Sequence, residues 1–116
     1  MPGHSITHYN VKVMKDLRAA FEDLIRNWPD VVLTEKFHVP HYIVNNIVFA
    51  RLFTERMVLT KLTDVQKLEI QKKINAKPFK TLSMSSAIWI GIKFTNIDDI
   101  STFLPYVRMS YENSQK

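Results

Sequence analysis

The chain of 116 residues contains no cysteine, and none of its apolar runs approaches the length that crosses a membrane. The missing cysteine excludes disulfide bonds, thiolate nucleophiles and zinc sites built on cysteine. A membrane helix needs about 18 or more consecutive apolar residues, so we expect no membrane partner. The N-terminus lacks the charged start and the continuous apolar run of a signal peptide, and we therefore expect a cytoplasmic protein.

The composition is that of a folded globular protein with a positive charge. Apolar residues make up 46% of the chain and charged residues 23%, which argues against disorder. We expect one domain over residues 1–116, with mobile ends at residues 1–9 and 113–116. The formal net charge of +5 favours polyanions over polycations as partners.

The segment from Tyr42 to Leu62 is predicted to form three consecutive strands. Its residues are rich in β-branched and aromatic types, which suit a pleated surface packed on one face. Asn45 and Asn46 lie between two apolar runs, and asparagine tolerates the positive φ angles of a two-residue hairpin turn. A second turn is expected at residues 54–56. Tight turns make neighbouring strands antiparallel.

Two further strands are predicted, at residues 31–37 and 87–94. Side chains alternate between the two faces of a strand. In the strand after the asparagine turn, this alternation predicts Phe49, Arg51 and Phe53 on one face and the residues between them on the other. The last strand carries a regular apolar set that we expect to face the core.

Three helices complete the predicted fold. The first, at residues 11–28, shows apolar residues at the helical period. The second begins at Thr63, which together with Gln66 fits a capping box. The third begins at Asn96 and frays after Glu112, and Pro105 is expected to interrupt it. The predicted class is α+β, an antiparallel β-meander sheet flanked by three helices in the order α-β-β-β-β-α-β-α.

Lysines concentrate around the second predicted helix, whose Val65 and Leu68 we expect to face inwards. Such a patch can contact a phosphate backbone. The alternative is a solvent-exposed helix face without a binding role, because lysines near the C-terminus of a helix interact favourably with its dipole. If nucleic acid is the partner, the expected phosphate contacts are Lys67, Lys72, Lys73, Lys77 and Lys80.

A second candidate site combines His38, His41, Arg51 and Trp89, the few polar and aromatic residues expected to converge at strand ends. Each has a structural alternative: the histidines flank a bend at Pro40, the arginine ends a strand or pairs with the acidic residue after it, and the tryptophan lies under a helix. No spacing in the sequence predicts a catalytic constellation, a metal site or a cofactor.

The chain resembles the TfoX/Sxy N-terminal domain family from residue 37 to residue 111, and the MmcQ/YjbR-like family is the second choice. The resemblance implies a stand-alone, non-enzymatic regulatory module of this α+β fold. The residues that carry it are Phe37, Tyr42, Val44, Asn45, Asn46, Phe49, Ala50, Leu59, Lys61, Leu62, Lys77, Pro78, Phe79, Met84, Trp89, Asp98, Asp99, Leu104, Pro105, Tyr106, Ser110 and Tyr111.

Two classes of function therefore remain open. The first, which the resemblance implies, is a non-enzymatic binding module linked to transcription or competence regulation through a protein or DNA partner. The second is a small-molecule-binding protein or enzyme that uses the histidine, arginine and tryptophan site. A homodimer formed through a sheet edge stays open beside both.

Overall fold

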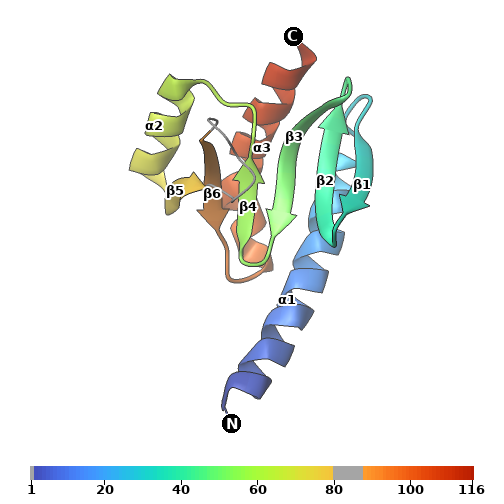
Figure 1. The fold of residues 1–116 in the computed structure, drawn as a ribbon, viewed down its shortest axis with the longest axis vertical. Helices are drawn as coiled ribbons and strands as arrows, with labels where there is room; N and C mark the ends of the chain where they lie inside the picture. The colour runs from blue at the N-terminus through green and yellow to red at the C-terminus, as the bar shows by residue number, and fades with distance from the viewer. Residues whose placement is uncertain (1, 80–87) are drawn as a thin grey trace.

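The computed structural model describes residues 2–79 and 88–116, with side chains from residue 12 onward. Six antiparallel strands form one sheet in the order β1-β2-β3-β4-β6-β5 (Figure 1). The strand β6 therefore inserts between β4 and the edge strand β5. The strands are β1 Val32–Lys36, β2 Val39–Val44, β3 Ile47–Phe53, β4 Arg56–Leu59, β5 Ala76–Phe79 and β6 Trp89–Lys93.

The helices are α1 Pro2–Ile25, α2 Asp64–Lys73 and α3 Ile100–Gln115, and the 3-10 turn η1 Ile97–Asp99 precedes the last of them. Two of them, α1 and α3, lie behind the sheet in the view of Figure 1, whereas α2 lies at its edge beside β5. The predicted α+β class, with a meander and three helices, is confirmed. No described helix is long and apolar enough to cross a membrane.

An aromatic cluster joins α1 and α3 to one face of the sheet. Phe21 of α1 contacts Tyr42 edge-to-face at 5.2 Å between ring centroids and Phe103 of α3 at 5.7 Å. Phe49 of β3 contacts Tyr111 of α3 at 5.4 Å. All five rings are fully buried. Edge-to-face pairs of this kind add about 0.5–1.5 kcal/mol each to the stabilisation from burial itself, so the cluster fixes both helices on this face.

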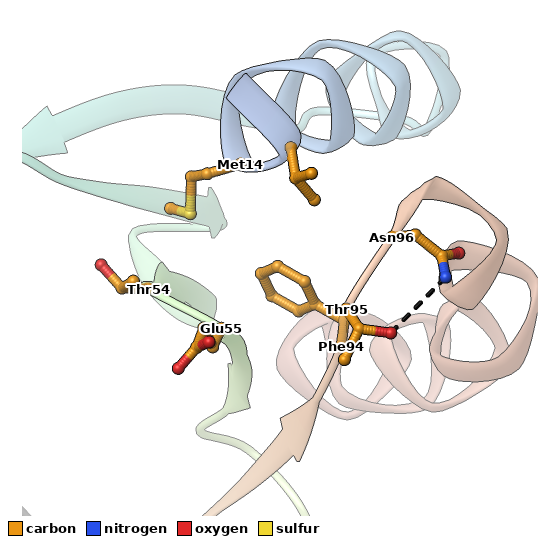
Figure 2. A pocket seen from close by; sticks show the side chains of 7 residues that line it. Met14, Thr54, Glu55, Phe94, Thr95 and Asn96 are labelled. Atoms are coloured by element: carbon orange, nitrogen blue, oxygen red, sulfur yellow. Dashed lines mark hydrogen bonds between the residues drawn. The ribbon is translucent and has the colours of Figure 1, made fainter. Parts of the chain in front are cut away.

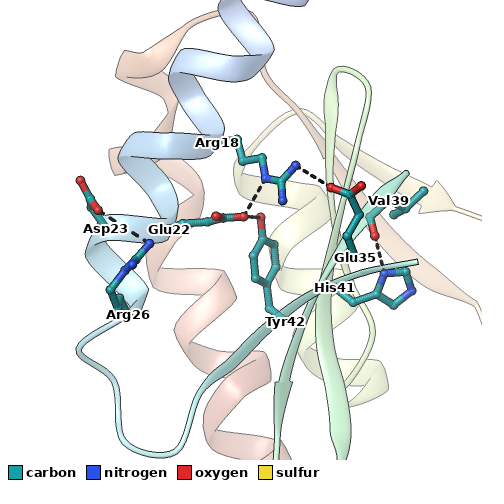
Figure 3. A network of polar contacts seen from close by, with 8 residues as sticks. All are labelled: Arg18, Glu22, Asp23, Arg26, Glu35, Val39, His41 and Tyr42. Atoms are coloured by element: carbon teal, nitrogen blue, oxygen red, sulfur yellow. Dashed lines mark hydrogen bonds and ion pairs between the residues drawn. The ribbon is translucent and has the colours of Figure 1, made fainter. Parts of the chain in front are cut away.

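Polar contacts on the same face surround the Tyr42 hydroxyl, which donates a hydrogen bond to Glu22 Oε2 at 2.9 Å (Figure 3). Arg18 bridges this carboxylate and Glu35 of β1, at 2.9 Å to each. Burial raises the pKa of Tyr42, and the negative charge of Glu22 raises it further. The tyrosine therefore remains a donor at any physiological pH. Glu35, which interrupts the apolar pattern of its strand, is accounted for by its arginine partner on α1.

The predicted turns and caps form as the sequence indicates. Asn45 and Asn46 both have positive φ, at 52° and 63°, as a two-residue hairpin of the favoured twist requires. The capping box of Thr63 and Gln66 forms with both hydrogen bonds. Asn96 caps the 3-10 turn. Pro105 lies inside α3, which continues from Ile100 to Gln115, so the prediction that this proline interrupts the helix was wrong.

A β-bulge changes the faces predicted for β3. Tyr42 pairs with Ala50 and Ile43 pairs with Val48, so Phe49 is an extra residue without a partner in β2. Beyond such a bulge the alternation shifts by one residue. Phe49 consequently lies in the core, whereas Arg51 lies on the opposite face, so the prediction that they share a face was wrong.

The remaining differences concern the second helix and the connection after it. Val65 and Leu68 are 65% and 60% exposed, so the prediction that they face inwards was wrong, and Ile70 is the buried residue of α2. The strand β5 was not predicted, and Pro78 is tolerated in it because this is an edge strand.

The long helices also differ from the prediction in where they end. The first begins at Pro2 and ends at Ile25, and turns follow it to Pro29. The last continues to Gln115 rather than fraying after Glu112. Ser114, in its final turn, is 1% exposed. Asn113 donates a hydrogen bond to the Lys61 carbonyl at 2.8 Å, which ties the helix end to the chain after β4.

Ser110 connects α3 to the bulge. Its hydroxyl donates to the carbonyl of Phe49 at 2.6 Å and accepts from the backbone N–H of Lys61 at 3.1 Å. The serine is fully buried. The described residues offer the Lys61 N–H no other acceptor, so one hydroxyl satisfies groups in two different segments.

Ser110→Ala is expected to lower the free energy of unfolding by about 1–3 kcal/mol, because it leaves the Lys61 N–H unpaired. Urea unfolding followed by circular dichroism measures this. Ser114→Ala is the matched control: among the described residues that hydroxyl bonds only to the Ser110 carbonyl of its own helix, at 2.9 Å. Its loss is expected to cost under about 1 kcal/mol. Equal losses for the two variants would contradict the bridging role.

Candidate functional site

The sheet face opposite α1 and α3, called here the open face, carries the candidate residues His41, Arg51 and Trp89. Its membership follows from the strand register, because paired residues point to the same side of a sheet. Arg51 pairs with His41 of β2 and with Val58 of β4, and Val58 pairs with Gly91 of β6. The residues two positions before and after these, on the same strands, point to the same side and complete the face.

Arg51 lies at the centre of the open face and is stacked on Trp89. Its guanidinium carbon lies 4.5 Å from the centroid of the indole ring, in cation–π geometry. Its Nε is buried and has no hydrogen-bond partner among the described residues. Arg51 also forms no ion pair with any described residue. Burial lowers the pKa of this guanidinium, which still remains a cation at neutral pH.

His41 is the neighbour of Arg51 across the strand pair and is 7% exposed. Its Nδ1 lies 2.7 Å from the Val39 carbonyl, so it donates there and leaves Nε2 as an acceptor (Figure 3). Burial lowers the pKa of His41. The hydrogen bond to Val39 opposes this, and the charges of Arg51 and Lys36 lower the pKa further. The imidazole is therefore neutral at pH 7.

A pair of phenylalanines continues the open face towards β5. Phe79 lies 4.8 Å from Phe53 between ring centroids, and both rings are half-buried. Gly91 makes room for the Phe79 ring and the Arg56 stem: a Cβ there would lie 3.3 Å from Phe79 Cδ2 and 3.4 Å from Arg56 Cδ. The ring and the arginine stem therefore lie directly over the glycine. Val58, between these groups, is fully buried.

The charge of the open face has one sign. Arg56 pairs with Lys93, and Lys77 pairs with Gly91, so these basic residues share the face with Arg51. Both lysines are exposed. Among the six described strands, Glu35 is the only acidic residue, and it points to Arg18 on α1. No carboxylate from a strand therefore neutralises the open face.

The lysines predicted to contact phosphate are divided between two elements. Lys67 is paired with Asp64 at 3.7 Å and is largely covered. Lys72 and Lys73 are exposed on the last turn of α2, and Lys77 lies on the open face in β5. Because α2 lies beside β5 (Figure 1) and ends at Lys73, shortly before that strand begins, Lys72 and Lys73 lie near this edge of the sheet. Lys80, and Met84 of the resemblance, lie outside the described residues.

Of the four residues predicted for a ligand site, three converge and one does not. His41 pairs with Arg51 across the strands, and the Arg51 side chain reaches Trp89, which lies two residues along β6 from the same row. His38 is exposed in the turn between β1 and β2, where it and Phe37 have positive φ. Arg51 is neither an exposed strand end nor a partner of Glu55, because it lies within β3 on a tryptophan.

A pocket of about 260 Å³ lies elsewhere, between α1, the turn after β3 and the loop after β6 (Figure 2). Met14, Phe94 and Thr54 line it, together with Thr95 and Asn96. The backbone N–H groups of these last two residues already bind the Asp99 carboxylate in the helix cap. Across the described residues, no group of three or more acidic or histidine side chains could hold a metal ion.

Sequence reasoning missed Arg56, Lys93 and the pair of Phe53 and Phe79 as members of one surface. Alternation along β6 does place Trp89, Gly91 and Lys93 on one face. It could not show that β6 pairs with β4, because α2 and β5 separate the two strands in sequence. That pairing brings Arg56 and Lys93 together.

The shifted pKa of His41 has a consequence for stability. The unfolded chain takes up a proton near the ordinary pKa of 6.5, whereas the folded chain does so only at lower pH. Protonation therefore favours unfolding, and stability falls as pH drops below about 6.5. His41→Gln is expected to flatten this dependence between pH 7.5 and pH 5.5, as measured by urea unfolding. The exposed His38→Gln is the control, and an unchanged slope in His41→Gln would contradict the assignment.

No protein-family model, curated protein or solved structure matches the chain. The resemblance to the TfoX/Sxy N-terminal domain family therefore stays a prediction. What the protein does has to be argued from the open face, where basic and aromatic side chains gather.

Proposed function

We propose that the protein is a non-enzymatic nucleic-acid-binding module that contacts its partner through the open face. The observation that carries the proposal is the pairing of uncompensated positive charge with aromatic rings on one sheet surface. Arg51, Arg56 and Lys93 lie among Phe79 and Trp89 there, and no acidic strand residue shares the face.

Electrostatics supplies the affinity in this proposal. A nucleic acid carries one negative charge per phosphate, and each lysine or arginine that contacts a phosphate releases a bound counterion. Lys77 and Lys93 are exposed and point away from the acidic groups of the helix face. Phosphate contacts of this type position the chain on the nucleic acid without reading its sequence.

Two further features support the proposal. Lys72 and Lys73 of α2 add positive charge near the β5 edge of the sheet. The resemblance to the TfoX/Sxy N-terminal domain family implies a regulatory module linked to transcription or competence, a role that binding to nucleic acid would serve. The absence of a catalytic constellation in the sequence favours a module that binds without chemistry.

The test is fluorescence anisotropy of a labelled 20-nucleotide DNA of mixed sequence, in single-stranded and duplex form, at several salt concentrations. We expect binding that weakens steeply with salt. In Arg56→Glu with Lys93→Glu, two phosphate contacts are lost. The slope of log K against log salt is then expected to fall by about 1.4 for a single strand, at about 0.7 for each contact.

The matched control is Lys15→Glu with Arg26→Glu, an exposed residue of α1 and an exposed residue of the turn that follows it. Each double variant changes the net charge by −4, from +5 to +1, so the two differ only in where the charge is lost. Lys72→Glu with Lys73→Glu tests the α2 lysines in the same assay. Absence of binding at low salt, or equal losses in the open-face and control variants, would contradict the proposed function.

A further inference from the structure

We infer that the open face binds single-stranded nucleic acid, with unpaired bases stacked on its aromatic rings. This inference rests on the proposed function and narrows its ligand. The aromatic groups concerned are Phe53, Phe79 and Trp89, which lie on strands β3, β5 and β6. A surface that bound only phosphates would need the cations and not these rings.

The rings are held in place and still partly accessible. Phe79 lies over Gly91 and against Phe53, so its ring is supported from beneath and from the side. Trp89 is supported by the Arg51 guanidinium at 4.5 Å. Each of the three rings is half-buried rather than fully covered. Because the rings are already oriented, a stacked base would find a surface that needs little reordering.

The width of this surface suits a few nucleotides. The strands that carry the rings belong to a run of four neighbours, β3, β4, β6 and β5, which is about 14 Å across at a strand spacing of about 4.8 Å. Within it Phe53 and Phe79 lean together to 4.8 Å between ring centroids, and Trp89 pairs with Phe79 on the neighbouring strand. Sheet surfaces of this kind bind two or three unpaired bases on aromatic side chains, with basic residues beside them for the backbone. In a duplex the base faces are covered by their neighbours, and reading the bases calls for a helix or ribbon that enters a groove.

Arg51 gives the surface a second polar function. Its Nε is buried without a partner among the described residues, directly beside the stacked indole. An arginine that stacks on a ring with one face and keeps donors free can bind a phosphate or a base edge next to a stacked base. The neutral His41 beside it supplies an acceptor.

The experiment uses Trp89 as its own reporter. The chain has two tryptophans, so Trp28→Phe leaves Trp89 as the sole fluorophore, and Trp89→Phe leaves Trp28, which packs against Tyr111 on the other face. Titration with oligo(dT) is expected to quench Trp89 and to leave Trp28 unchanged. By anisotropy, the single strand is expected to bind at least tenfold more tightly than a duplex of equal length and salt.

Substitutions then separate stacking from charge. Phe79→Leu keeps the charge and the apolar contact over Gly91, and is expected to weaken single-strand binding roughly 5- to 150-fold without changing the salt slope. Phe37→Leu is the matched control, because Phe37 is 95% exposed in a distant turn. Thermal melting checks that each variant is folded. The Trp89 fluorescence titration keeps Phe79, so its result stands even if Phe79→Leu does not fold.

The outcomes distinguish this inference from the proposed function. Duplex binding as tight as single-strand binding, with no change in Trp89 fluorescence, would overturn the single-strand inference and leave nucleic-acid binding in place. A protein that binds neither form at low salt overturns both. Quenching of Trp89 by the single strand, together with weaker binding in Phe79→Leu but not in Phe37→Leu, supports the single-strand inference and the proposed function.

Discussion

The burial of one aromatic cluster against a single face of the sheet is the constraint on which the rest of the structure depends. The helices α1 and α3 lie on the same side of the sheet, where the rings of Phe21, Phe103 and Tyr111 pack with Tyr42 and Phe49 of the strands. An antiparallel sheet can cover one face with helices and leave the other to a different use. Here both long helices are committed to the core face. The opposite face is therefore free of them, and the side chains that alternate onto it need not be apolar.

The bulge at Phe49 makes this division work within a single strand. At the bulge the strand contributes the Phe49 ring to the core, and beyond it the alternation places Arg51 on the open face and Leu52 in the core. The cost of the bulge is a disrupted ladder, and Ser110 of α3 compensates by binding the Phe49 carbonyl. The same hydroxyl holds the Lys61 N–H, so the helix, the bulge and the chain after β4 are fixed relative to one another.

Charge is divided between the two faces as clearly as hydrophobicity. On the helix face, Arg18 is compensated by Glu22 and Glu35, and the network closes on Tyr42. On the open face, arginine is compensated by an aromatic ring instead of a carboxylate. A cation stacked on a ring keeps its full charge and can still donate hydrogen bonds to an anionic ligand. In an ion pair, the carboxylate neutralises the charge and occupies those donors. This difference is the physical basis for assigning binding to the open face.

Much of the fold could be predicted from local signals: the α+β class, the asparagine turn with its positive φ angles, the capping boxes and the meander. Each of these is encoded within a few consecutive residues, so propensity and turn chemistry suffice. The sequence also pointed to His41, Arg51 and Trp89 as polar and aromatic residues without an obvious core role. It could not place Phe49 and Arg51 on opposite faces, because a bulge is set by pairing with β2 and by the contact with Ser110. Nor could it join Arg56 to Lys93, because β4 and β6 meet only in the folded sheet. The sequence by itself thus determined the elements other than β5, their turns and the positive charge. The tertiary structure alone decided which side chains share a face, because strand register is a non-local property of the chain.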